Sequence, residues 1–396
     1  MSVGVEGRPS DSKVVFYNDP RIRSLFFQLL LLGLIVALFW FAYDNTVTNL
    51  RKRNIAQGFA FWDVEAGFDI SQTLISYSAA STYGRAFWVG LLNTMLVSLV
   101  SIFFATILGV IIGILRLSRN WLVAKLAMVY VEIFRNVPLL LILYFWYRGV
   151  LGLLPEPRES IKLPADILLN TRGLLMPKPI VGDAFIYPLI AFVSTVVLGA
   201  VLFWWARRVQ ARTGNRPNAG LLSTSMIIGL PLIVFFLSGS PLSFDVPVQG
   251  RFNASGGITL PPEFVSLVIG LTTYTAAFIA ENVRAGIVAI SKGQTEAAQA
   301  LGLSHGQTIR LVIMPQALRV IVPLLNSEYL SLTKNSSLGV SIGYPDLVNV
   351  FTGTVLNQTG QAVEMVSVTM LVYLTLSLLT SAFMNWFNRR VALVER

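Results

Sequence analysis

The chain has 396 residues, 54% hydrophobic and only 13% charged, whereas soluble domains carry about 25% charged residues, so the composition predicts a protein with several transmembrane segments. There is no cysteine and a single histidine, His305, which excludes disulfides, thiolate zinc sites, thiol nucleophiles and a Ser-His-Asp triad within the membrane. The net charge of +10 does not indicate nucleic-acid binding, because the basic residues cluster at the ends of apolar segments and serve there as topological anchors.

Eight apolar windows are long enough to cross a bilayer as helices of about 20 residues. No small-residue cleavage site follows the first window, so we expect it to be retained as a helix. The sequence therefore predicts an all-α, polytopic transmembrane helical bundle with about eight spans. The windows are Leu25–Tyr43, Phe87–Leu115, Trp121–Tyr147, Ala184–Ala206, Leu221–Leu237, Phe264–Val283, Ala317–Ile342 and Met365–Phe387.

The distribution of lysine and arginine predicts that both chain ends lie in the cytoplasm. With the N-terminus inside, most basic residues fall in internal loops, and the loop near Asp346 has none. The run Arg51-Lys52-Arg53 departs from this pattern, because it would lie outside and close to the first span. The internal positions are Arg116, Arg119, Lys125, Arg207, Arg208, Arg212, Arg216, Arg284, Lys292, Arg310, Arg319, Arg389, Arg390 and Arg396.

Two regions look like additions to a smaller membrane core. Residues 1–85 hold an N-terminal cytoplasmic segment, the first span and a long external loop, and residues 149–262 hold a pair of spans with Pro-rich external stretches. Removing both leaves five spans, from residues 86–148 and 263–396, with a polar segment at 284–318 between the third and fourth. Because an inserted pair of helices restores the original orientation, the topology of the core is preserved.

Small residues and prolines mark special positions inside the spans. Gly109 and Gly113 lie four residues apart and form a small-xxx-small face, which predicts close packing against another helix. Pro138 and Pro323 are expected to break or kink the third and seventh spans.

Two spans carry a Glu-x-x-Arg pair, Glu132 with Arg135 and Glu281 with Arg284. Residues at i and i+3 share a helical face, so the two charges can neutralise each other. A lone charge at the bilayer centre costs about 2.5–3.5 kcal/mol on insertion scales. The pairs are therefore either interfacial salt bridges or part of a transport path, and the sequence leaves both interpretations open.

The seventh span carries Asn326, Glu328, Lys334 and Asn335. This polar density predicts a face turned toward a cavity or a partner subunit rather than toward lipid. A cation such as Lys334 suits an anionic group of a ligand, and an acid such as Glu328 suits a cationic group. A second interpretation is that these two side chains pair with each other and stabilise packing.

The polar segment predicts two short helices with a sharp turn at Gly302, where glycine tolerates a left-handed backbone. Pro315 is expected to end the second helix. The small side chains of Ala297 and Ala298 give the first helix a surface that another protein's groove can approach closely. Two pairs have capping-box spacing and mark the helix starts, namely Ser291 with Gln294 and Ser304 with Gln307.

From Glu296 to Pro315 the chain resembles the EAA loop of importer permeases of the ABC transporter superfamily. The shared pattern is Glu-Ala-Ala, three residues, Gly, nine residues and a hydrophobic-x-hydrophobic-Pro ending. In that family the loop docks into the ATP-binding subunit and couples hydrolysis to gate movement. The resemblance therefore implies a coupling role for Glu296, Ala297, Ala298, Gly302 and Pro315.

Two further stretches resemble permeases for polar and basic amino acids, namely Glu132–Leu140 and Ala277–Gly286, where Phe278 replaces the usual Tyr. The seventh span resembles their Lys-Asp-[Thr/Ser]-Ser-Leu segment, but Asn335 replaces the common Asp, which puts that acid's role in doubt. The matches imply an L-amino-acid cargo. They also imply candidates for the substrate path or gate, namely Glu132, Arg135, Glu281, Arg284, Asn326, Glu328 and Lys334.

The resemblance implies a type I ABC importer permease core of five helices plus extra helices, in the bacterial inner membrane. Within the family, the whole chain resembles the larger permease subunits of the general L-amino-acid importers of Gram-negative bacteria. A second permease, two ATP-binding subunits and a periplasmic amino-acid-binding protein are the implied partners. The chain has no G-x-x-x-x-G-K-[ST] motif, so we expect no enzyme activity, metal or cofactor of its own, with ATP and Mg bound by the partner ATPase.

Two other classes of protein remain as alternatives. A proton-coupled secondary transporter would use Glu132, Glu281 and Glu328 as acids within the membrane, and its uptake would persist without ATP. A membrane-embedded enzyme would need a dyad of Lys334 with Ser331 or Ser337. The sequence does not show which amino acids are carried or what the inserted helices do.

Overall fold

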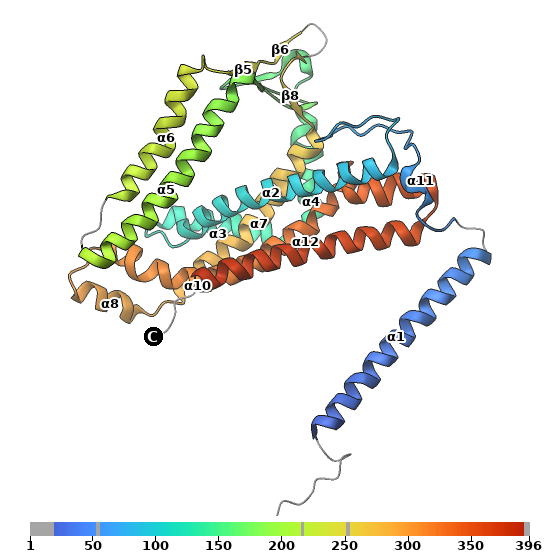
Figure 1. The fold of residues 1–396 in the computed structure, drawn as a ribbon, viewed down its shortest axis with the longest axis horizontal. Coiled ribbons are helices and arrows are strands. Elements are labelled where there is room, and N and C mark those ends of the chain that lie inside the picture. Colours follow the sequence, from blue (N-terminus) through green and yellow to red (C-terminus); the bar gives the residue numbers. More distant parts are fainter. Residues whose placement is uncertain (1–19, 53–55, 215–217, 251–253, 392–396) are drawn as a thin grey trace, which may run out of the picture.

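The computed structural model describes residues 20–52, 56–214, 218–250 and 254–391, and the predictions for residues 1–19, Arg53, Arg216 and Arg396 fall outside them. Long helices dominate the molecule (Figure 1). These helices are α1 (Pro20–Lys52), α2 (Tyr83–Leu115), α3 (Trp121–Asn136), α4 (Leu139–Tyr144), α5 (Ile186–Thr213), α6 (Ala219–Leu237), α7 (Pro262–Val288), α8 (Lys292–Ala300), α9 (His305–Thr308), α10 (Met314–Asn335), α11 (Leu356–Thr359) and α12 (Ala362–Val391).

Shorter helical turns extend or connect these helices. Three of them are π-helices, η3 (Phe145–Val150), η7 (Ile309–Ile313) and η9 (Val348–Val355). The others are the 3₁₀ turns η2 (Ala60–Asp63), η4 (Leu151–Leu153), η5 (Pro157–Glu159), η6 (Asp183–Phe185) and η8 (Ser336–Ile342).

Within the described residues, seven helical segments are long and apolar enough to cross a membrane, and one bent pair brings the number to eight. The predicted polytopic helical bundle is therefore confirmed. The third window is not one continuous helix, however, because Trp121–Asn136 and Leu139–Leu153 meet at an angle of 108°. Pro138 has no N–H to donate, and it holds Val137 in an extended conformation (φ −95°, ψ 129°).

The core of the bundle forms where α2, α3, α10 and α12 pack around α7 and one another. The small-residue face of α2 lies against α7, as predicted. A Cβ on Gly109 would lie 2.6 Å from Cβ of Ile279, and a Cβ on Gly113 would lie 2.8 Å from the carbonyl oxygen of Ala280. Both distances are shorter than side chains tolerate, so this helix pair depends on glycine.

Replacing Gly109 by alanine should therefore destabilise the protein by about 1–3 kcal/mol, because α2 and α7 must move apart. Thermal unfolding of the detergent-purified protein measures the effect. Gly229→Ala in α6 is the matched control, since a Cβ there meets no atom within 4 Å. Equal transition temperatures for the two variants would contradict the packing argument.

The Pro-rich stretches on either side of α5 and α6 form short antiparallel strands, which the sequence analysis did not predict. They gather at one end of the molecule, near the first residues of α7 (Figure 1). One sheet has the order β1 (Ile161–Leu163), β2 (Ile167–Asn170), β3 (Gly173–Met176) and β8 (Ile258–Leu260). The two-stranded sheets pair β4 (Lys178–Val181) with β5 (Leu242–Asp245), and β6 (Val248–Gln249) with β7 (Ala254–Ser255). Because β4 precedes α5 and β5 follows α6, their pairing closes the base of an α5–α6 hairpin.

The loop between α1 and α2 folds over the first turns of α2. Trp62 and Phe351 each place their ring centroid 5.2 Å from that of Phe87. Nearby, the Asn93 side chain donates to the carbonyl oxygen of Pro345 at 2.9 Å, and the Thr94 hydroxyl accepts from the N–H of Leu347 at 3.0 Å. These contacts hold the segment between α10 and α12 against α2.

Candidate functional site

The predicted turn at Gly302 is present between α8 and α9. Gly302 has φ +77°. Its N–H donates to the carbonyl oxygen of Gln299 at 2.9 Å, and the N–H of Leu303 donates to the carbonyl oxygen of Ala298 at 3.1 Å. This pair of bonds is the Schellman motif that ends helices at a left-handed residue. The reversal of the chain between α8 and α9 therefore depends on a residue that tolerates positive φ.

Only one of the two predicted capping boxes forms. At the start of α9, the N–H of Gln307 donates to Ser304 Oγ at 3.4 Å, and Gln307 Oε1 accepts from the N–H of Ser304 at 2.9 Å. The Ser291 side chain makes no capping bond, so that prediction is wrong. Instead, Gln294 Oε1 accepts from Nε2 of Gln316 at 3.2 Å, which ties α8 to α10.

The prediction that Pro315 ends the second helix is also wrong. A helix continues from His305 to Ile342, through η7 and into α10. Pro315 lies in the first turn of α10 after the π-helix. The π-helix directly before it interrupts the regular i→i−4 hydrogen-bond pattern, so the missing N–H of proline is tolerated inside this continuous helix.

The polar segment at residues 284–318, named the coupling segment for its resemblance to the EAA loop, presents an exposed surface around its turn. Glu296 and Ala297 are exposed, whereas Ala298 is buried. Leu301, directly before the turn, is 82% exposed. A large apolar side chain that is this exposed, next to small alanines, is typical of a surface that contacts another protein. Sequence reasoning did not single out Leu301, although an apolar residue next to the glycine turn was a visible signal.

A three-membered ion cluster lies at the end of α7 that leads into this segment. Glu281 Oε1 pairs with Nη2 of Arg284 at 2.6 Å, as the sequence predicted, and Glu281 also pairs with Arg116 at the end of α2. Arg116 had been assigned only a topological role, because nothing local in the sequence links it to α7.

The second Glu-x-x-Arg sequence does not form an ion pair, so its predicted neutralisation is wrong. Glu132 and Arg135 are both exposed at the end of α3. Glu132 Oε2 accepts from Nδ2 of Asn136 at 3.2 Å, and the Arg135 guanidinium lies 5.5 Å from the centroid of the Phe278 ring. Because both side chains are exposed, neither depends on the other for a counter-charge.

A small polar cavity separates α7 from α10. Its volume is about 220 Å³. Glu328 lines it and accepts a hydrogen bond at 3.1 Å from Asn282 Nδ2. Arg135 attracts Glu328 electrostatically and stands over Phe278, another wall of the cavity. The carboxylate of Glu328 thus borders the cavity, whereas the Arg135 guanidinium acts on it from outside the lining. The lining is Tyr274, Thr275, Phe278, Glu328, Ser331 and Asn335.

The structure does not bring Lys334 and Glu328 together. They are six residues apart on α10, about 240° around the helix, and Lys334 faces a separate cavity along α12 that Tyr373 also lines. Ser331 lies on the Glu328 side, and the Ser337 hydroxyl donates to the backbone carbonyl of Lys334 at 2.7 Å. No contact supports a Ser/Lys dyad. Asn326 keeps its Oδ1 buried without a hydrogen-bond partner among the described residues.

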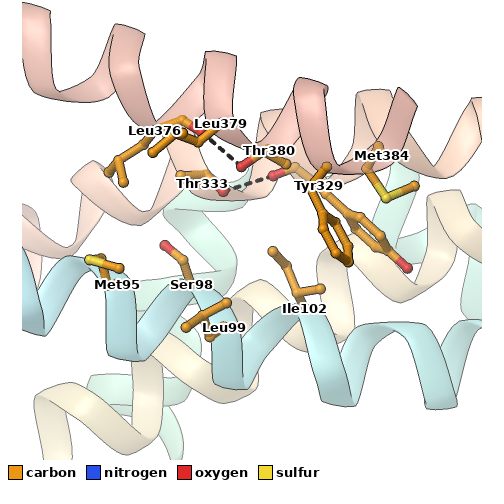
Figure 2. Close-up of a pocket in the computed structure, with 11 residues that line it drawn as sticks. Met95, Ser98, Leu99, Ile102, Tyr329, Thr333, Leu376, Leu379, Thr380 and Met384 are labelled. Atoms are coloured by element: carbon orange, nitrogen blue, oxygen red, sulfur yellow. Dashed lines mark hydrogen bonds between the residues drawn. The ribbon is translucent and has the colours of Figure 1, made fainter. Parts of the chain in front are cut away.

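A larger groove of about 410 Å³ lies between α2, α10 and α12 and is almost entirely apolar (Figure 2). Met95, Leu99 and Leu379 contribute to its walls. The hydroxyls of Thr333 and Thr380 bond to carbonyls of their own helices, at 2.9 Å and 2.8 Å. Ser98 also lines the groove, and its buried hydroxyl has no hydrogen-bond partner among the described residues. With no charged side chain in its lining, the groove suits hydrocarbon and not a zwitterion.

The fold and the coupling segment define the class of protein. A family model described as "Binding-protein-dependent transport system inner membrane component" matches residues 181–393, more than half of the chain, and the chain belongs to this family. It is therefore a multi-pass membrane permease and not an enzyme.

Three curated relatives resemble the chain over different lengths. The general L-amino acid transport system permease protein AapQ of Rhizobium johnstonii is 54% identical over 378 residues, 96% of this chain and 94% of the relative. The glutamate/glutamine/aspartate/asparagine transport system permease protein BztB of Rhodobacter capsulatus is 42% identical, over 96% of both chains. The glutamate/aspartate import permease protein GltK of Escherichia coli O157:H7 is 29% identical over 218 residues, 54% of this chain and 94% of the relative. The family and subgroup resemblance inferred from the motifs is thus confirmed.

Proposed function

We propose that this chain is the transmembrane permease subunit of an ATP-driven importer of L-amino acids. The observation that carries the proposal is the coupling segment, an exposed pair of short helices around Gly302 set into a chain of the importer permease family. AapQ and BztB match nearly the whole chain, and both are named as transport system permeases for amino acids, which supports an amino-acid cargo. Glu296, Ala297 and Gly302 then lie on the surface that meets the ATPase, and the buried Ala298 packs beneath it. Pro315 lies within the continuous helix from His305 to Ile342 that receives the movement.

The proposed complex contains a second permease, two ATP-binding subunits that hold ATP and Mg, and a periplasmic binding protein. ATP binding closes the ATPase pair and pulls the coupling segment, so that the core helices rock and expose a central path outward; hydrolysis resets them. In this arrangement both chain ends and α8 lie in the cytoplasm, and the strands lie in the periplasm.

We also propose that residues 86–148 and 263–396 form the five-helix core and that residues 1–85 and 149–262 are additions. Nearly all of GltK aligns with only 54% of this chain, so a shorter permease occurs among the relatives. The separate packing of the α5–α6 hairpin supports the assignment of residues 149–262.

The cavity beside Glu328 is the proposed contact with cargo. The carboxylate of Glu328 suits an ammonium group, and the guanidinium of Arg135 suits a carboxylate. Asn326 and Lys334 then lie on neighbouring parts of α10, and the Glu281–Arg284 pair closes the path toward the coupling segment.

Glu328→Gln should reduce amino-acid uptake by the reconstituted complex at least about tenfold, because the variant loses a charge-assisted contact worth about 1.5–3 kcal/mol. Lys334→Gln should have a smaller effect, since Lys334 faces α12. Initial uptake rates with ATP supplied measure both. A larger loss of uptake rate for Lys334→Gln than for Glu328→Gln would contradict this assignment and would indicate that the cargo contacts the Lys334 face of α10.

Affinity purification of the tagged chain from native membranes tests the assembly. We expect an ATP-binding subunit and a second permease among the recovered proteins, identified by mass spectrometry. A chain that purifies alone under conditions that preserve membrane complexes would contradict the proposed assembly.

A further inference from the structure

The α5–α6 hairpin stands beside the rest of the bundle and packs closely only on itself (Figure 1). Exposed apolar side chains lie along both of its helices. Its own interface is tight, since a Cβ on Gly199 would lie 3.2 Å from Cδ1 of Ile227. The outward side chains of both helices are exposed, and neither helix contains an aspartate or glutamate. A helix that is apolar all round and uncovered by protein is suited to a lipid environment.

Aromatic side chains fix the depth of this hairpin in a bilayer. Tyr187 is 60% exposed near the start of α5, and Trp204 and Trp205 are 55% and 52% exposed near its end. The 17 residue-to-residue steps from Tyr187 to Trp204 span about 26 Å of helix, close to the thickness of the hydrocarbon core. Tyr and Trp concentrate at the two membrane–water interfaces, so Trp204 marks the level of the lipid headgroups at the end of the hairpin away from the strands.

Three arginines follow directly at this level, Arg207, Arg208 and Arg212, and all three are exposed. The Arg208 guanidinium lies 3.7 Å from the centroid of the Trp204 ring, and that of Arg207 lies 5.0 Å from the centroid of Phe203. Stacking on rings restricts the side chains and leaves the guanidinium N–H groups free to donate. Within the described part of the chain, none of the three forms an ion pair.

We propose that these residues, the arginine cluster, bind the headgroup phosphate of an anionic phospholipid. The position of the cluster favours a lipid over an acidic protein, because the stacked guanidinium groups lie at the depth of the headgroups on helices whose remaining surface is apolar. Basic residues close to a membrane surface each strengthen the attraction to anionic lipid. The site goes beyond a topological signal, which requires positive charge but no stacking on Trp204.

The test uses the purified complex in nanodiscs of phosphatidylcholine with a small fraction of photo-crosslinkable phosphatidylglycerol. Mass spectrometry should locate crosslinks in α5 near residues 203–213. The triple variant Arg207→Gln/Arg208→Gln/Arg212→Gln should reduce this labelling at least about fivefold, from the loss of three charges. The corresponding triple lysine variant keeps the charge and the topology, and it should label more than the glutamine variant but less than the native protein, because lysine lacks the planar guanidinium.

Arg51→Gln/Lys52→Gln at the end of α1 is the matched control, since it removes basic residues from another helix end; labelling of α5 should remain unchanged. Equal labelling of the glutamine variant and the native protein would overturn the proposal. Equal labelling by a crosslinkable phosphatidylcholine would also overturn it, because the site would not select anionic lipid. Loss of the ATP-binding subunit from the glutamine variant, with native lipid labelling, would assign the cluster to a protein partner instead.

Discussion

Replacing Gly302 by valine is expected to abolish ATP-driven uptake while the complex still hydrolyses ATP. Gly302 has φ +77°, a conformation that β-branched residues essentially do not adopt. A Cβ at this position would meet no atom within 4 Å, so the effect arises from the backbone and not from a clash. The turn between α8 and α9 must then open, and the surface that meets the ATPase changes shape.

Gly302→Asn provides a control at the same position, because asparagine tolerates the left-handed region and replaces glycine at helix ends. We expect this variant to retain most of the uptake. Import and ATPase rates are compared for the two variants in proteoliposomes. Normal import by Gly302→Val would remove the coupling role of the turn, and equal failure of both variants would show that side-chain size, and not φ, is what matters.

Glu281→Gln is expected to destabilise the protein by about 1–3 kcal/mol, because the partly buried carboxylate makes charge-assisted bonds to two guanidinium groups. Both Arg116 and Arg284 depend on this carboxylate, and the variant would leave two guanidinium groups together without a counter-charge. Thermal unfolding of the detergent-purified protein measures the change.

Glu132→Gln is the matched control, because it alters the same Glu-x-x-Arg sequence at an exposed site without an ion pair. We expect Glu132→Gln to lower the free energy of unfolding by less than about 0.5 kcal/mol, as for most surface substitutions. The loss of stability in Arg284→Gln should lie between those of Glu281→Gln and Glu132→Gln, since Glu281 keeps Arg116 as a partner. Similar losses for Glu281→Gln and Glu132→Gln would mean that the cluster contributes no special stability.

The membrane spans could be predicted from the sequence because length and apolarity alone decide them. The break in the third span depends on Pro138, whose signal was visible but whose angle is set by the packing of α4 against α7. The strands were missed because their short apolar runs are stabilised by pairing across the α5–α6 hairpin, as between β3 and β8, which are far apart in sequence.

The candidate site could be predicted only where its chemistry is local. The turn at Gly302 and the capping box at Ser304 depend on neighbouring residues, and both are present. The two Glu-x-x-Arg sequences look alike, yet only Glu281 gains a partner from α2, a contact between residues 165 positions apart. Similarly, the cation beside Glu328 is Arg135 of α3 and not Lys334 of the same helix.

The most direct test of the central claim is amino-acid uptake by the purified complex in proteoliposomes, measured with ATP available to its ATP-binding subunits and no ion gradient. We predict accumulation of amino acid that requires both hydrolysable ATP and the binding protein. Uptake that proceeds without ATP and follows an imposed proton gradient would contradict this account and would make the chain a secondary transporter.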